Sequence, residues 1–306
     1  CISYFVLLMF MVSSFKLSRN SGIFRRGYLQ MMSSSFETDT KLKSTKDMVC
    51  VVSSASKGIG LEFTKQILQR SDCKVVGIIR SKYESVSASS TLHHLKSAFP
   101  DRFFIVDGID LEVQKSIDEA ATIIQENFDH VDMLLNVSGI LGDNNIATPG
   151  PERSISGIDR DWLLKSLNIN LVGHVMMTKA LFPLLSHRNS PNKDLPHSKV
   201  VNLSARVGSI SDNRLGGWYS YRMSKTALNM FTKTLSVESK RDKVIVISCH
   251  PGTTDTDLSK PFQKNIQRDK LFSVESSVSM MLEVIWKLQP NDSGKFFAYD
   301  GSEIPY

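Results

Sequence analysis

The sequence predicts an α/β protein whose single large domain is built on a doubly wound parallel sheet of about seven strands. Two observations support this fold class. From residue 47 onward, short apolar runs rich in β-branched residues alternate with longer patterns that have the apolar spacing of helices. The short runs are apolar at nearly every position, which is typical of strands covered on both faces. A chain of 306 residues is long enough for such a domain, and residues 47–306 show no linker or internal repeat.

Strands and helices alternate along the whole of this domain. The seven predicted strands are residues 48–53, 74–79, 102–106, 131–137, 199–204, 243–249 and 295–299. The predicted helices are residues 61–70, 112–128, 161–187, 218–240 and 274–288, with Pro183 marking a bend or end of the longest. Polar segments with Gly, Pro or Asn predict loops over 141–158 and 188–198. Right-handed crossovers would bring the carboxyl ends of the strands to one edge of the sheet, where such folds bind ligands.

The first 46 residues predict a separate extension outside the domain. Residues 4–12 form an apolar run of nine, too short to span a bilayer but within the length of a signal-peptide core. A stretch with Ser, Arg and Lys but no acid follows, as in mitochondrial or plastid transit peptides. The alternative starts from the fact that the chain opens at Cys1 and not at Met: either the true start is missing, or the early residues are translated from outside the real reading frame and Met31 or Met32 could be the start. We therefore expect an intracellular protein, cytoplasmic or, if the segment is genuine, plastid or mitochondrial, without stable membrane insertion.

Composition and charge argue against several classes of protein. The four cysteines are scattered without a Cys-x-x-Cys pair, so we expect a reducing compartment, no disulfide scaffold and no metal site. The net charge of +6 suggests nucleic-acid binding, but the first 36 residues carry four basic residues and no acid. Only about +2 remains for the other residues. The domain is therefore not expected to bind nucleic acid.

The loop over residues 53–60, Ser-Ser-Ala-Ser-Lys-Gly-Ile-Gly, is a candidate phosphate site. It follows the first strand and opens a helix, where backbone N–H groups and the helix dipole can hold a pyrophosphate. Gly58 would allow close approach of the phosphates and Gly60 close packing of helix on strand, whereas Ser54 stands where a first glycine is expected. The alternative is an ordinary turn of small residues. The expected binding residues are Ser54, Ser56, Lys57, Gly58, Ile59 and Gly60.

Residues at the end of the second strand favour NADP(H) over NAD(H). An NAD-selective site usually has an acidic residue there for the ribose 2′-hydroxyl, but this chain has Arg80 and Ser81. A cation suits a 2′-phosphate, and Lys57 adds a second positive charge nearby. The alternative is that both cations are simply solvated at the surface.

Two further strand ends could contact the adenosine half of the cofactor. Asp110 and Leu111 follow the third strand and could seat the adenine ring. The segment from Asn136 to Gly139 ends the fourth strand and could form a wall beside the adenosine ribose.

Tyr221 and Lys225 form a candidate catalytic pair. Four residues apart on one helix, they share a face. Tyrosine has a pKa near ~10, so it is a poor acid or base unless a nearby cation favours the phenolate. Such a pair could protonate a carbonyl oxygen as hydride arrives from a nicotinamide. Asn170, Ser204 and the Pro251–Thr254 segment would gather at the same edge of the sheet.

Taken together, these motifs resemble the short-chain dehydrogenase/reductase superfamily, over essentially residues 47–306 and in the expected order. Residues 203–225, 250–262 and 294–306 are similar to the C-factor-like, sniffer-type carbonyl reductase branch. The resemblance implies a Rossmann-type fold, hydride transfer between NADP(H) and a small carbonyl or secondary alcohol, and a homodimer or homotetramer.

The same resemblance implies a role for each matching residue. Tyr221 would be the general acid/base, and Lys225 would lower its pKa and hold the nicotinamide ribose. Asn170 would order a water that relays protons. The residues expected to flank the nicotinamide are Pro251, Gly252 and Thr254.

Two departures from the family pattern raise an alternative function. Ala205 stands where the family has a substrate-orienting serine, so Ser204, Ser209 or a water would have to take that role. If the Ser54 position needs a positive φ, a serine there is strained and cofactor binding weakens. The alternative is a dinucleotide-binding signalling or scaffold protein with reduced or no catalysis.

Overall fold

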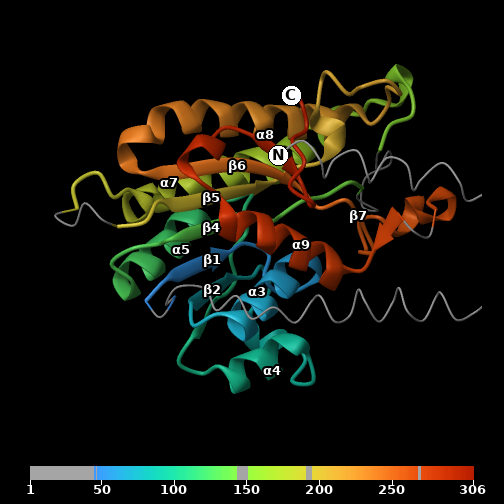
Figure 1. Cartoon of the computed structure of the whole chain (residues 1–306). Helices are drawn as coiled ribbons and strands as arrows, with labels where there is room; N and C mark the ends of the chain where they lie inside the picture. The colour runs from blue at the N-terminus through green and yellow to red at the C-terminus, as the bar shows by residue number, and fades with distance from the viewer. Residues whose placement is uncertain (1–44, 46, 143–150, 191–194, 268–269) are drawn as a thin grey trace, which may run out of the picture. The chain divides into compact units, whose positions relative to one another are not determined.

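A computed structural model describes residues 45, 47–142, 151–190, 195–267 and 270–306. The predicted targeting segment lies outside the described residues, except for Thr45, as do parts of both predicted loops. The described chain forms a seven-stranded sheet in the order β3-β2-β1-β4-β5-β6-β9 (Figure 1), and every pair is parallel. The doubly wound fold predicted from the sequence is therefore confirmed. The strands are β1 Val49–Val52, β2 Lys74–Ile78, β3 Phe103–Val106, β4 Met133–Asn136, β5 Ser198–Leu203, β6 Val244–His250 and β9 Phe296–Ala298.

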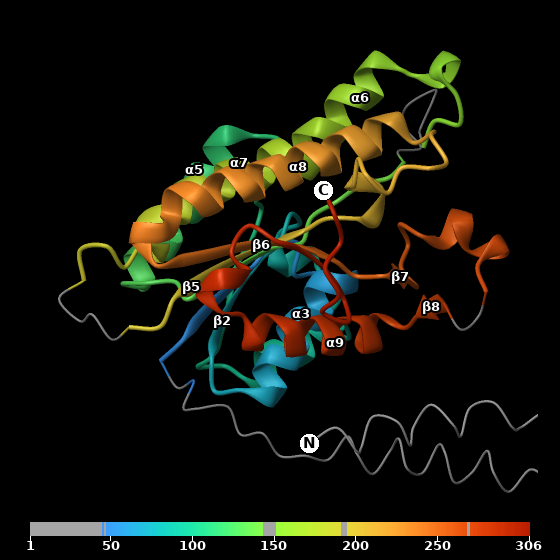
Figure 2. The ribbon, with the colours of Figure 1, turned by 45° about the horizontal axis from the view of Figure 1, so that its top comes forward.

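Helices cover both faces of this sheet, as Figure 2 shows. One face carries α3 Gly58–Arg70, α4 Thr91–Ala98 and α9 Val274–Lys287. The other carries α5 Gln114–Asn127, α7 Gly173–Leu185 and α8 Tyr219–Glu238. Short 3-10 turns lie at Tyr83–Ser85, Ile155–Gly157, Arg206–Gly208, Ser239–Asp242, Lys260–Asn265 and Pro290–Asp292.

The strand residues alternate between two apolar cores. In β1, Cys50 and Val52 pack beneath α3, whereas Val49 and Val51 pack beneath α5. All four are buried, which explains why the run is apolar throughout. Chain order runs outward from β1 to β2 and β3 on one side, and from β4 onward on the other. The carboxyl ends of β1 and β4 therefore flank the switch point at which doubly wound sheets bind ligands.

The longest predicted helix is interrupted where a candidate site residue lies. α6 (Arg160–Leu167) runs into a π-helical segment, Asn168–Val172, and then into α7. Pro183 is inside α7, which ends two residues later at Leu185. A π segment widens the helix and is frequent at functional sites.

One helix and two short strands were not predicted from the sequence. α4 is an eight-residue helix capped by the Ser90 side chain, and a separate two-stranded sheet pairs β7 (Thr253–Thr254) with β8 (Leu271–Phe272). The small sheet orders the chain directly after Pro251–Gly252.

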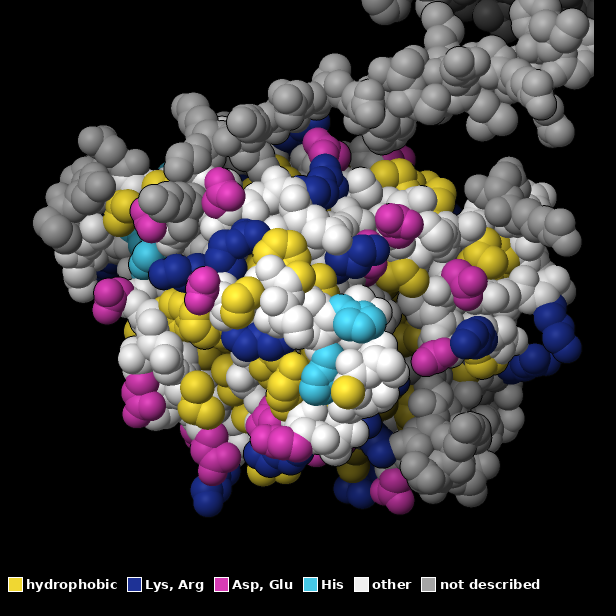
Figure 3. All heavy atoms as spheres, turned by 90° about the horizontal axis from the view of Figure 1, so that it is seen from below, with side chains coloured by type: hydrophobic (Ala, Val, Ile, Leu, Met, Phe, Trp, Pro, Cys, Tyr) yellow, Lys and Arg dark blue, Asp and Glu magenta, His cyan; other side chains and the backbone are white. Residues whose placement is uncertain are grey.

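Charged side chains of both signs are mixed on the described surface. On the face seen in Figure 3, Lys and Arg side chains are interspersed with Asp and Glu. Among the described residues, no helix combines the length and apolar composition of a membrane span. The same part of the chain shows no cluster of three metal-ligating side chains.

Candidate functional site

The loop between β1 and α3 has the geometry of a phosphate cradle. Gly58 starts α3 with a φ of +54°, and a Cβ there would meet no atom within 4 Å, which leaves room for a ligand. A Cβ at Gly60 would lie 2.3 Å from the carbonyl oxygen of Ser54, so only glycine fits. No side chain caps α3 and no acid lies in its first turn. These residues therefore fit a pyrophosphate, which the helix N–H groups and dipole can hold.

Ser54 adopts the left-handed conformation that the sequence departure put in question. Its φ is +55°, a strain of about 1–2 kcal/mol for a residue with a Cβ. Its hydroxyl hydrogen-bonds the Ser138 hydroxyl at 2.7 Å. The neighbouring Ser53 hydroxyl accepts the Val137 N–H at 2.8 Å. These contacts join the phosphate loop to the end of β4 and offset part of the strain. Ser56 in the loop and Ile59 at the start of α3, also predicted here, are both half-buried.

Arg80 and Ser81 lie exposed just beyond the end of β2. No described residue forms a hydrogen bond or ion pair with Arg80, so its guanidinium is available to a ligand. Lys57 is also exposed. The next lysine, Lys82, is paired with Asp107 at 3.3 Å.

Asp110 and Leu111 form the turn after β3. The Asp110 carboxylate accepts the N–H of Glu112 at 2.9 Å, and its own N–H donates to the Ser116 hydroxyl at 2.8 Å. Leu111 lies against Gly173, where a Cβ would be only 2.9 Å away. Both residues are half-buried at the carboxyl edge of the sheet, next to β2.

Asn136 does not present its side chain to the surface. It is buried and donates to the Thr178 hydroxyl and the Asn202 amide oxygen, both at 2.9 Å. Asn136 therefore holds β4 against β5 and α7, and any effect on a bound ligand would be indirect. Gly139, three residues later, is exposed, and a Cβ there would lie 3.5 Å from Asn170 Oδ1 and 3.8 Å from Lys225 Nζ.

The Tyr221–Lys225 pair lies on one face of α8, as predicted. Lys225 Nζ is 5.9 Å from the centre of the Tyr221 ring and donates to the Leu203 carbonyl at 2.8 Å. Burial lowers the pKa of Lys225 to about 7 and raises the pKa of Tyr221 above its ordinary value. The site thus holds a neutral phenol beside a lysine whose pKa is about 7. No described residue hydrogen-bonds the Tyr221 hydroxyl.

Asn170 sits in the π segment and ties it to the pair. Its Oδ1 accepts the Ile140 N–H at 2.8 Å, and its Nδ2 donates to the Ile140 carbonyl at 3.0 Å. The same amide donates to the hydroxyl of Ser224, between Tyr221 and Lys225 in sequence, at 3.1 Å. Asn170 therefore joins the end of β4 to α8.

The two serines that were expected to replace the hydroxyl missing at Ala205 donate their hydroxyls to other groups. Ser204 donates to Asn229 Oδ1 at 2.7 Å, and Ser209 donates to the Pro305 carbonyl. Ala205 is the residue that packs with Tyr221, in an apolar cluster with Leu141. The structure thus presents a methyl group, not a hydroxyl, beside the phenol.

The Pro251–Thr254 segment is braced from α9. The Pro251 carbonyl accepts the hydroxyls of Ser277 at 2.6 Å and Thr254 at 3.1 Å. Gly252 has a φ of +75° and lies against the rings of Phe272 and Tyr299. Ser277 was not predicted from the sequence, because nothing local distinguishes it from other helical serines.

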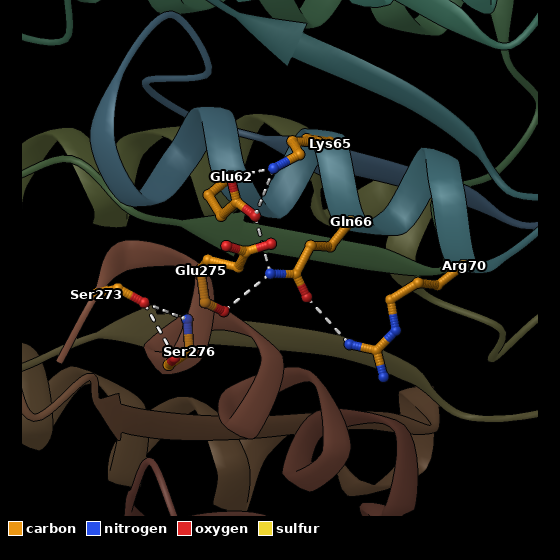
Figure 4. Close-up of polar contacts among 7 residues, drawn as sticks. All are labelled: Glu62, Lys65, Gln66, Arg70, Ser273, Glu275 and Ser276. Carbon is orange, nitrogen blue, oxygen red and sulfur yellow. Dashed lines mark hydrogen bonds and ion pairs between the residues drawn. The ribbon is translucent and has the colours of Figure 1, made fainter. Parts of the chain in front are cut away.

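Figure 4 shows how α9 is in turn fastened to α3. Gln66 is buried on α3 and donates to the Glu275 carbonyl and to Glu62 Oε1, both at 2.9 Å. Arg70 donates to Gln66 Oε1 at 3.0 Å (Figure 4) and pairs with Glu283 on α9 at 2.5 Å. The helix that opens at the phosphate loop and the helix that holds Pro251 therefore form one unit.

His174, like Ser277, was not predicted from the sequence. It is buried on α7, and its Nε2 hydrogen-bonds the Ser138 carbonyl at 2.8 Å. Burial, with a smaller contribution from the Lys225 charge, lowers the pKa of His174 to about 3, so the ring is neutral. Its position four residues after Asn170, on the same helical face, is the signal that could have revealed it.

Comparisons with known proteins agree with this geometry. A family model described as short chain dehydrogenase matches residues 48–267. An uncharacterised oxidoreductase of Schizosaccharomyces pombe is 28% identical over 275 residues, covering 86% of this chain and 100% of that protein. The C-signal protein of Myxococcus xanthus is 32% identical over 163 residues, covering 53% of this chain and 90% of that protein.

The fold is also similar to those of solved carbonyl reductase structures. A carbonyl reductase from chicken fatty liver, solved with NADPH bound, superposes with a TM-score of 0.71 at 25% identity, covering 87% of this chain and 100% of that one. The carbonyl reductase Sniffer of D. melanogaster gives a TM-score of 0.71 at 25% identity, covering 86% of this chain and 100% of that one.

Proposed function

The chain belongs to the short-chain dehydrogenase family of oxidoreductases, and from this premise we propose that it transfers hydride between NADP(H) and a carbonyl or secondary alcohol. The observation that carries the proposal is the convergence around Tyr221: Lys225 one turn away, with Asn170 and Gly139 from two other elements near the Lys225 ammonium. This arrangement supports a role for Tyr221 as proton donor, because doubly wound sheets bind their ligands at the carboxyl ends of the strands.

The phosphate loop and Arg80 would hold the cofactor. No side chain caps the start of α3, and a Cβ at Gly58 would meet no atom within 4 Å, so a pyrophosphate could bind there. Arg80 is exposed just beyond β2 and would pair with a 2′-phosphate. When bound, NADPH supplies the hydride. The similar structure solved with NADPH supports this choice, and Pro251–Thr254, braced by Ser277, would lie beside the nicotinamide.

Tyr221 would donate the proton. Because burial raises its pKa, the phenol stays protonated at neutral pH and can give its proton to the carbonyl oxygen as charge develops there. The ammonium form of Lys225 then stabilises the phenolate that remains. Since its pKa is about 7, this form is well populated only near or below neutrality in the free protein. Ala205 leaves orientation of the carbonyl to a water or the substrate itself.

Replacement of Tyr221 by Phe tests the mechanism. It removes the proton donor but keeps the ring that packs against Ala205, so turnover should fall by at least about 1,000-fold while NADPH binds within twofold of wild type. Lys115→Met changes a lysine on α5 whose side chain is 87% exposed; it is the matched control and should change neither value. Turnover by Tyr221→Phe within tenfold of wild type would reject Tyr221 as the donor.

A dinucleotide-binding signalling or scaffold protein is the second candidate. Two observations favour it. Ala205 removes the hydroxyl that would orient the substrate, and the strain at Ser54 weakens the phosphate loop that would bind the cofactor. Purified protein that binds NADPH but oxidises none of it with a panel of aldehydes, ketones and quinones would favour this candidate.

We also propose that the chain forms a homodimer or homotetramer. Met223, Met230 and Val237 recur every seven residues on α8 and are 42%, 66% and 59% exposed. Such a stripe would suit contact with a second copy. Light scattering on the purified chain tests it: a monomeric mass at micromolar concentration would reject the proposal.

A further inference from the structure

Glu152 carries a buried carboxylate that the proposed chemistry does not use. It lies in the segment before α6, and only 4% of the residue is exposed. Its carboxylate accepts the backbone N–H of Ser220 at 3.2 Å and also the Ser220 hydroxyl. Ser220 is completely buried and directly precedes Tyr221. A buried acid with these partners indicates a specific role, because an isolated buried charge is costly.

The partners of Glu152 show that it caps α8. The side chain of Trp218, at the N-cap position, does not cap the first turn of α8, and that turn contains no acid. The first N–H groups of a helix have no partner within the helix, and this end of the dipole is positive. Glu152 thus provides, from a distant segment, the hydrogen-bond acceptor that a local N-cap side chain would supply.

Glu152 also holds the strained turn that leads into α8. Gly216, Gly217 and Trp218 have consecutive positive φ values of 64°, 64° and 54°. Trp218 is the one with a Cβ, and such strain persists only where the surroundings enforce it. Its N–H donates to the Glu152 carbonyl at 2.5 Å, and a Cβ at Gly217 would lie 3.2 Å from the same oxygen.

We propose that Glu152 is a positioning residue for Tyr221: by capping α8 through Ser220 and holding the Trp218 turn, it fixes the direction of the phenol toward the carbonyl. The Trp218 ring meets the Tyr221 ring nearly edge-on, with centres 6.3 Å apart, so a shift of the turn moves the phenol. Misplacement of a catalytic group by about 1 Å can lower the rate 100-fold. The inference rests on the proposed function.

The test uses the full chain with Glu152→Ala and Glu152→Gln. Glu152→Ala should lower kcat at least about tenfold, yet leave the Kd for NADPH within twofold, because the phosphate loop is on α3. Amide hydrogen exchange at Ser220 and Tyr221 should accelerate at least about tenfold. Glu152→Gln should recover most of the lost kcat, since its amide oxygen can still accept the Ser220 N–H.

Ser90→Ala is the matched control. It removes the cap of α4, a helix without candidate site residues, so it should lower thermal stability but leave kcat unchanged. Wild-type kcat in Glu152→Ala, or equal losses in kcat and NADPH affinity, would overturn the proposal. If the wild-type chain reduces no carbonyl, the proposed function fails, but amide hydrogen exchange in Glu152→Ala still tests the positioning role. An unchanged exchange rate at Tyr221 would overturn that role, and a raised rate would support it.

Discussion

Burial of Lys225 makes the stability of the free protein depend on pH in a defined way. The Lys225 pKa falls from its ordinary value of 10.5 to about 7, because the side chain is desolvated. Between these two values the unfolded chain holds a proton at Lys225 that the folded chain lacks. Folding then requires release of this proton, so the folded state gains stability as pH rises from about 7 toward 10.5.

The size of the effect follows from the two pKa values. A drop of the Lys225 pKa from 10.5 to about 7 destabilises the folded protein by roughly 5 kcal/mol at low pH, and most of this penalty is still present at pH 7. Between pH 7 and pH 9 the penalty should shrink by roughly 2 kcal/mol. Lys225 is only 2% exposed, so solvent screening reduces this value little.

Urea unfolding followed by tryptophan fluorescence at pH 7 and pH 9 measures the effect, with Lys225→Met as the perturbation. The free energy of unfolding of the wild type should gain roughly 2 kcal/mol more than that of Lys225→Met between the two pH values. Lys115→Met, whose side chain is 87% exposed, should behave like wild type. Equal gains in wild type and Lys225→Met would show that Lys225 keeps an ordinary pKa, which would refute the reasoning.

Three other substitutions test separate parts of the site. Arg80→Ala should weaken NADPH binding at least about tenfold and NADH binding less than twofold in fluorescence titrations, because only NADPH carries the 2′-phosphate; equal losses would contradict this assignment. Ala205→Ser should raise kcat/KM by up to about 100-fold, by restoring a donor beside Tyr221, and no increase would mean that another group already orients the carbonyl. Gln66→Met should lower the free energy of unfolding by about 1–2 kcal/mol and weaken NADPH binding severalfold, since it removes the three hydrogen bonds that the Gln66 side chain makes in Figure 4; unchanged calorimetric stability would show that α9 is held by its other contacts.

The fold could be predicted from the sequence because its signals are local. Each central strand is buried on both faces, so β1, β2 and β4–β6 appear as continuous apolar runs. The eight-residue helix α4 was missed although Leu92 and Leu95 have helical spacing, because it spans only two turns. The two-residue strands β7 and β8 carry no local signal and depend on tertiary pairing.

The candidate site was only partly predictable for a geometric reason. Helical spacing places Tyr221 and Lys225 on one face, and the structure agrees. At a strand end, however, successive side chains point to opposite faces, and the sequence does not reveal which face meets the ligand. Asn136 and Ser204 therefore turn inward, and their expected contacts with cofactor and substrate stay predictions. Glu152 acts through a contact far away in the sequence, so no local pattern could reveal it.

The measurement that tests the account most directly is a fluorescence titration of the full chain with NADPH and with NADH, followed by a panel of carbonyl compounds in the same cuvette. The account predicts that NADPH binds at least tenfold more tightly than NADH and is oxidised when a substrate is present. Binding without oxidation across the panel would contradict the reductase and favour the scaffold. Absence of binding would show that the strained Ser54 loop does not hold a dinucleotide.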